Sequence, residues 1–140
     1  MLRRKMVYGI LVFVLVFISC GDRPNTVPYT RVNFSVLINA TELIHDDRCD
    51  YFHGKGRGVG GTVIYHCVST FYAYDCACPY DWKEGGRVVY NFALQLVCDE
   101  CGSAFNILDG SPMNDSKAKN SLRRYNTQLS DDMMTLWVYN

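Results

Sequence analysis

Short stretches in which apolar and polar residues alternate, each ended by turn residues, constrain the fold of this chain more than any other feature. Val32, Phe34, Val36 and Ile38 recur at every second position, and the strand-like residues 62–67 are followed by 70–74 after two residues, Val68 and Ser69. A period of two indicates a strand with one buried face, and so short a gap is typical of a β-hairpin. No stretch shows a convincing helical period.

Four further segments have strand character: 87–97, 104–107, 122–129 and 134–139. In the first of them every second residue is large and apolar, so one face should pack against the core through Val88, Tyr90, Phe92, Leu94 and Leu96. The polar residues 39–50 are expected to form a loop. Six or seven short strands separated by turn residues predict an all-β fold, an antiparallel sandwich or a small barrel.

The first 20 residues are typical of a secretory signal. A basic start, Arg3, Arg4 and Lys5, precedes an apolar run over 7–18 that is too short to span a membrane comfortably. The run ends in Phe-Ile-Ser-Cys, which resembles a bacterial lipobox whose cysteine, here Cys20, becomes lipid-modified; Phe17 departs from the leucine expected there. A signal peptide cut elsewhere, or an uncleaved anchor, is the alternative.

The expected organisation is therefore a lipoprotein signal peptide over 1–20, a spacer over 21–30 and one domain over 31–140. Such a protein would lie in the envelope of a bacterium, attached by its lipid to a membrane outside the cytoplasm. About 120 residues are enough for a single core and exclude a multidomain enzyme. Without the three basic leader residues, 11 basic side chains face 14 acidic ones, and this negative balance argues against a nucleic-acid partner.

Six cysteines remain after Cys20: Cys49, Cys67, Cys76, Cys78, Cys98 and Cys101. In an exported protein they either pair or hold a metal, and the sequence does not choose among the connectivities of three disulfides. Two close pairs, 76/78 and 98/101, fall at the ends of predicted strands, in loops that hairpins bring together. Paired thiolates on facing loops suit tetrahedral zinc or iron. For Cys49 and Cys67, which lie outside both loops, the alternatives are a disulfide and free buried thiols.

The residues around these loops add a resemblance. The segment 73–80, Ala-Tyr-Asp-Cys-Ala-Cys-Pro-Tyr, followed by Cys98-Asp-Glu-Cys-Gly-Ser103 and by Leu-Arg-Arg-Tyr over 122–125, is similar to a Rieske domain. Two loops of that family, Cys-x-His and Cys-x-x-His-Gly-Ser, hold a [2Fe–2S] cluster. The order of strands and loops matches over about 31–140, and the chain resembles Rieske-like lipoproteins of the Bacteroides group in particular. The resemblance implies a β-fold with a two-loop tip that binds the cluster.

The departure from the family is at the ligands, because Tyr80 and Cys101 stand at the two histidine positions. By the resemblance Cys78, Cys98 and Cys101 would be ligands, and Cys76 could supply a fourth sulfur. An all-thiolate cluster would have a low potential, since anionic ligands replace neutral ones. The expected function is cluster binding and electron transfer with a redox protein partner, in a carrier rather than an enzyme. The alternative is a cluster-free structural or interaction protein with zinc or disulfides at the cysteine loops.

Overall fold

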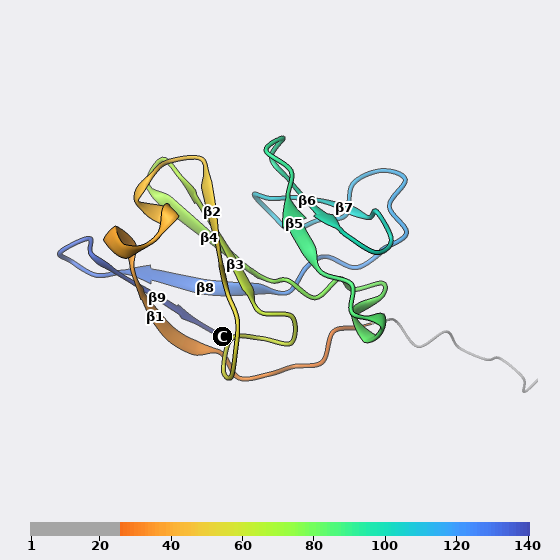
Figure 1. The fold of residues 1–140 in the computed structure, drawn as a ribbon, viewed down its shortest axis with the longest axis horizontal. Coiled ribbons are helices and arrows are strands. Elements are labelled where there is room, and N and C mark those ends of the chain that lie inside the picture. The colour runs from red at the N-terminus through yellow and green to blue at the C-terminus, as the bar shows by residue number, and fades with distance from the viewer. Residues whose placement is uncertain (1–25) are drawn as a thin grey trace, which may run out of the picture.

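The computed structural model describes residues 26–140, which form two antiparallel sheets (Figure 1). The larger sheet has the strand order β1-β9-β8-β4-β3-β2 and the smaller one the order β5-β6-β7. The strands are β1 (Asn33–Leu37), β2 (Arg48–Phe52), β3 (Thr62–Cys67), β4 (Thr70–Asp75), β5 (Val88–Tyr90), β6 (Gln95–Cys98), β7 (Ala104–Asn106), β8 (Arg124–Leu129) and β9 (Thr135–Tyr139). The all-β antiparallel fold predicted from the sequence is confirmed.

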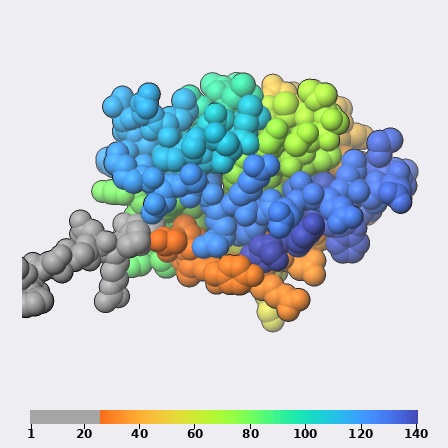
Figure 2. Space-filling view, turned by 180° about the vertical axis from the view of Figure 1, so that it is seen from behind, coloured from red at the N-terminus to blue at the C-terminus, as the bar shows by residue number. Residues whose placement is uncertain are grey.

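Helical structure in residues 26–140 is limited to three single turns of 3₁₀ helix: η1 (Ile38–Ala40), η2 (Glu42–Ile44) and η3 (Trp82–Glu84). None of the described helices is long and apolar enough to cross a membrane. The last strand pairs with the first, with Phe34 opposite Val138, and Figure 2 shows the C-terminal segment lying beside the N-terminal one on the rear face. This pairing brings the two ends of the described chain into one sheet.

Strand β3 separates two apolar cores, because its alternate side chains point to opposite faces. Ile64 belongs to the core enclosed by the larger sheet, with Phe71, Leu136 and Val138. Its neighbours in sequence, Val63 and Tyr65, belong to a second core that lies between the two sheets. The members of the second core from the smaller sheet and its flanks are Val88, Tyr90, Leu96, Cys98, Phe105 and Ile107. The smaller sheet is thus attached to the larger one by packing.

The hairpin predicted over 62–74 is confirmed, with Cys67 opposite Thr70. The single strand predicted over 87–97 is wrong, because the chain turns between β5 and β6. Phe92 and Leu94 lie in that turn with left-handed backbones, φ 60° and 58°, and they are 74% and 50% exposed instead of facing the core. Val88, Tyr90 and Leu96, on the strands themselves, are buried as predicted.

The loop predicted over 39–50 is only partly correct. It contains η2 and then enters β2, which pairs with β3 through Cys49 opposite Tyr65. The predicted signal peptide and the lipidation site at Cys20 lie outside the described residues. Of the predicted spacer, Val27 is buried and its carbonyl accepts a hydrogen bond from Arg123.

Candidate metal centre

A buried carboxylate fixes the point at which the first cysteine loop leaves the larger sheet. Asp75, the last residue of β4, is fully buried. Its two oxygens accept hydrogen bonds from the N–H groups of Val59, Gly60 and Ala77 and from the hydroxyl of Tyr125, at 2.7–2.8 Å. A buried carboxylate is tolerated only when its charge is compensated by such donors. Asp75 thereby ties β8 and the glycine-rich segment before β3 to the backbone next to Cys78.

Backbone hydrogen bonds close each of the two cysteine loops. In the first loop Cys78 N–H donates to the carbonyl of Gly86, and a bridge between Ala77 and Arg87 continues the pairing toward β5. In the second loop, between β6 and β7, Cys98 N–H donates to the carbonyl of Ser103. Since β5 pairs with β6, both loops emerge at the same end of the smaller sheet.

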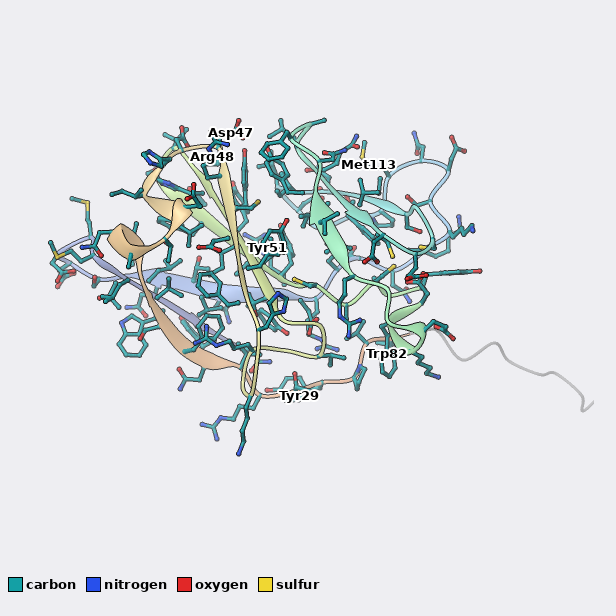
Figure 3. All side chains as sticks on the ribbon, viewed as in Figure 1. Tyr29, Asp47, Arg48, Tyr51, Trp82 and Met113 are labelled. Atoms are coloured by element: carbon teal, nitrogen blue, oxygen red, sulfur yellow. The ribbon has the colours of Figure 1, made fainter. Side chains whose placement is uncertain are left out.

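Four side chains converge between these loops: Cys78, Asp81, Cys98 and Cys101. One donor atom from each lies within 4.8 Å of the other three. The Sγ atoms of Cys78 and Cys101 are 3.8 Å apart, and Cys98 Sγ lies 3.3 Å from Asp81 Oδ1. The site lies beside η3, whose Trp82 is labelled in Figure 3. Three soft sulfur donors and one carboxylate at this spacing can hold a metal ion.

Burial controls the protonation of these thiols. Three of the converging side chains are buried: Cys78, Asp81 and Cys98. The fourth, Cys101, is partly exposed. Burial raises the pKa of Cys78 well above its ordinary value and that of Cys98 to about 11. Without a metal these two thiols are therefore neutral at pH 7, and a metal ion must displace their protons when it binds.

Three of the four cysteines predicted as ligands are brought together, and the fourth is not. Cys76 is buried in the core between the sheets, and its sulfur is not one of the four converging donors. The chain bends at Cys76 before it reaches the loop, and the Cys76 side chain packs within that core, whose members include Val63 and Val88. Tyr80, at the other family ligand position, is 45% exposed.

Asp81 was not among the residues predicted as ligands. A signal for it is present in the sequence, because Asp81 follows Cys78 at the same spacing at which Cys101 follows Cys98. The two acids within the second loop, Asp99 and Glu100, are exposed.

Cys49 and Cys67 lie on one face of the β2–β3 pair, because Cys49 is opposite Tyr65 and Cys67 follows Tyr65 by two residues. Both are free thiols in the structure. Burial, with smaller contributions from the nearby Asp47 and Asp50, raises the pKa of Cys49 to about 12. The predicted disulfide between the two cysteines remains a prediction, and it would require the strands to shift, because such diagonal neighbours lie about 7–8 Å apart.

The donor types present differ from the ligand set of a Rieske-type cluster. That cluster has two irons, each with its own pair of protein ligands, and histidines bind one of them. By family position one pair would be Cys78 and Cys98 and the other Tyr80 and Cys101, so neither histidine is present. Cys101 lies at single-ion spacing from Cys78, with the two Sγ atoms 3.8 Å apart. By ligand chemistry the donor set therefore does not match that of a Rieske-type cluster.

No family model and no curated protein matches the chain. A chain in the complex of reduced oxygenase and oxidized ferredoxin in carbazole 1,9a-dioxygenase is similar, with a TM-score of 0.53 and 15% identity over 79% of this chain and 94% of that one. The ferredoxin of carbazole 1,9a-dioxygenase from Nocardioides aromaticivorans IC177 also has a TM-score of 0.53, with 14% identity over 79% of this chain and 97% of that one.

A protein described as the small subunit of an NADH-dependent nitrite reductase from Mycobacterium tuberculosis has a TM-score of 0.50 and 13% identity, over 80% of this chain and 97% of that one. Identities this low speak to the fold alone. The chain has the fold of Rieske-type ferredoxins.

Proposed function

We propose that this protein is a small electron carrier of Rieske-type fold whose redox centre is iron bound by the thiolates of Cys78, Cys98 and Cys101. The observation that carries the proposal is the convergence of these three sulfur atoms with Asp81 to within 4.8 Å. Tetrahedral thiolate sites select zinc and iron, and of these two metals only iron changes its oxidation state. The ferredoxins among the structural neighbours support this role.

The position of the site also favours electron transfer. Cys101 is partly exposed and Tyr80 is 45% exposed, so a metal between the loops would lie close to the surface. A carrier needs this proximity because its partner must approach the metal. We expect a redox protein as that partner, in keeping with the oxygenase–ferredoxin complex among the neighbours. A [2Fe–2S] cluster, expected from the resemblance, would need Tyr80 and Cys101 to act in place of the two family histidines, and the proposal does not depend on it.

Export and lipid attachment at Cys20 are part of the proposal and rest on the leader sequence. Thr26, Val27 and Pro79 line one small hollow at the surface. The chain upstream of residue 26 therefore begins next to the first cysteine loop. A lipid on Cys20 would hold the loop end of the molecule near the membrane, because six residues span at most about 20 Å. The redox partner would then be a protein at the same membrane surface.

The second candidate function is a structural or interaction module in which zinc occupies the same four donors. The observation that favours it is the burial of Cys78, Asp81 and Cys98, since structural zinc sites are closed to solvent and four-coordinate. Zinc would stabilise the loops without carrying electrons.

The test uses the full chain, expressed in a bacterium, solubilised from the membrane fraction and purified without oxygen. Iron, zinc and acid-labile sulfide are measured per chain, together with the visible spectrum before and after reduction. We expect iron and a thiolate charge-transfer spectrum that bleaches reversibly. Cys98→Ser should abolish both, whereas Cys67→Ser, a matched loss of a partly buried thiol outside the loops, should retain them. Zinc alone, or no metal with all thiols free, would overturn electron transfer.

A further inference from the structure

We propose that the two cysteine loops are a pair of matching metal-binding turns that together hold one tetrahedral ion, with Asp81 as the fourth ligand beside Cys78, Cys98 and Cys101. The inference rests on the proposed metal centre and specifies it. It replaces the two-iron cluster of the fold family by a single-ion site, and it assigns a ligand that has no counterpart among the family's ligand positions.

The two loops repeat one pattern of residues and hydrogen bonds. Cys78-Pro-Tyr-Asp81 and Cys98-Asp-Glu-Cys101 each place two candidate ligands three positions apart. In the first turn the carbonyl of Cys78 accepts from Trp82 N–H, four residues on, and in the second the carbonyl of Cys98 accepts from Gly102 N–H, also four residues on. Ligands separated by two residues are the ordinary spacing of tetrahedral zinc sites.

Backbone groups lie around the first sulfur of each turn. Those of Tyr80 and Asp81 lie close to the Cys78 thiol, and those of Glu100 and Cys101 lie close to the Cys98 thiol. Donors to a ligating sulfur stabilise its negative charge and fix its direction. Each turn thus offers such donors to its first cysteine, three positions before the second ligand of the same turn.

The spacing of the donor atoms matches a single ion. Metal–sulfur bonds of 2.3 Å at tetrahedral angles place two sulfurs about 3.8 Å apart. The Cys78 and Cys101 sulfurs, one from each turn, are 3.8 Å apart. The distance from Cys98 Sγ to Asp81 Oδ1 is shorter, 3.3 Å, as expected for a sulfur and an oxygen on one ion, because metal–oxygen bonds are shorter than metal–sulfur bonds. A cluster of two irons would instead hold its ligand pairs apart across the bridging sulfides.

The Asp81 carboxylate is only 8% exposed, and its oxygens lie against the Cys98 thiol, which is a weak hydrogen-bond donor. A buried carboxylate needs stronger compensation than a thiol provides, and a metal ion supplies it. The carboxylate packs against Gly86, where an added Cβ would collide with Asp81 Oδ1. The side chain is therefore held at the site rather than turned toward solvent.

The test is a titration of the metal-free, fully reduced full chain with Co²⁺, a spectroscopic substitute for zinc and iron in tetrahedral sites. We expect one Co²⁺ per chain, with tetrahedral ligand-field bands and sulfur-to-metal charge transfer. Asp81→Asn should weaken binding by about 10- to 100-fold. Asp81→Cys should restore tight binding and strengthen the charge-transfer band, which also shows that position 81 tolerates replacement. Asp99→Asn removes the same charge beside Cys98 and should leave affinity and spectrum unchanged.

Two results would overturn the inference. One is equal loss of affinity in Asp81→Asn and Asp99→Asn, which would reveal a general effect of charge. The other is two irons with two sulfides in the anaerobically purified protein. The second result would leave the electron-carrier proposal intact, whereas a protein purified with zinc that binds one Co²⁺ through Asp81 would support the single-ion site and remove electron transfer.

Discussion

The hydroxyl of Tyr125 donates a hydrogen bond of 2.7 Å to Oδ2 of Asp75, and both side chains are almost entirely buried. The two residues belong to adjacent strands, since Tyr125 in β8 is opposite Ala73 in β4. The same carboxylate binds Ala77 N–H, one residue before the first ligand. Stability of the larger sheet and the position of the metal turns therefore depend on one buried group.

Replacement Tyr125→Phe should lower the free energy of unfolding by about 2 kcal/mol, because it removes a hydrogen bond to a buried charge. Urea unfolding of the full chain measures this loss. Tyr139→Phe, at an exposed position of β9, is the control and should change little. Equal stability of the Tyr125→Phe variant and the wild type would contradict the structural role assigned to this bond.

Replacement Gly86→Ala should weaken metal binding through Asp81, because the new methyl group would occupy the place of the Asp81 carboxylate. We expect a loss of about 10-fold in affinity, measured by competition of Zn²⁺ between the protein and a chelator. In an Asp81→Ala background the same replacement should cost much less, since the carboxylate that clashes with the new methyl group is already removed. Equal losses in the two backgrounds would point to a general distortion of the loop.

Replacement Ser103→Ala should lower the reduction potential of the iron-loaded protein. Ser103 Oγ lies 3.1 Å from Cys101 Sγ and accepts a hydrogen bond from Ala118 N–H, which leaves its own proton for a thiolate. Loss of that donor destabilises the more negative, reduced state, by tens of millivolts for a bond of about 1 kcal/mol. Ser116→Ala, whose hydroxyl bonds the Ala104 backbone instead, is the matched control in the same voltammetric measurement.

The rate of alkylation of Cys49 should rise steeply with pH and show no plateau between about pH 7 and 10. Burial raises its pKa to about 12, with Asp47 and Asp50 adding to the shift, so the neutral thiol dominates below that pH. Its reaction with iodoacetamide, followed by peptide mass spectrometry, should accelerate about tenfold per pH unit from 7 to 10. In denaturant the rate should level off above the ordinary thiol pKa of about 8.5.

A plateau near pH 9 in the folded protein would contradict the burial of Cys49. If Cys49 becomes alkylated only after reduction, together with Cys67, the predicted disulfide is present in the exported protein.

The parts of the fold that follow from local sequence could be predicted. The hairpin of β3 and β4 was accessible because alternation and a two-residue turn are both encoded within 14 residues. The break between β5 and β6 was not, because Phe92 and Leu94 continue the apolar alternation while their left-handed backbones reverse the chain. Strand β2 was hidden because Arg48 and Asp50 interrupt its apolar character, and its pairing with β3 depends on residues distant in sequence.

The site was predictable to the same extent. The three cysteines that converge could be identified as candidates from spacing and resemblance, because both loops flank recognisable strands. Asp81 could not be distinguished from other loop acids by residue type, and Cys76 is the chemically stronger candidate. Only the three-dimensional arrangement separates them, since Cys76 faces the core between the sheets while Asp81 meets the sulfurs.

An ion shared by Cys78 and Cys98 would act as a cross-link over the 19 residues between them, which include β5. Closing a loop of that size removes about 3 kcal/mol of conformational entropy from the unfolded chain. The smaller sheet is attached to the larger one mainly by packing. In the metal-free protein, the amides of the smaller sheet should therefore exchange with solvent faster than those of the larger sheet. Loading the site should slow exchange in β5 and β6 while leaving β3 and β4 nearly unchanged, so that metal supply would set how long this half of the molecule stays folded.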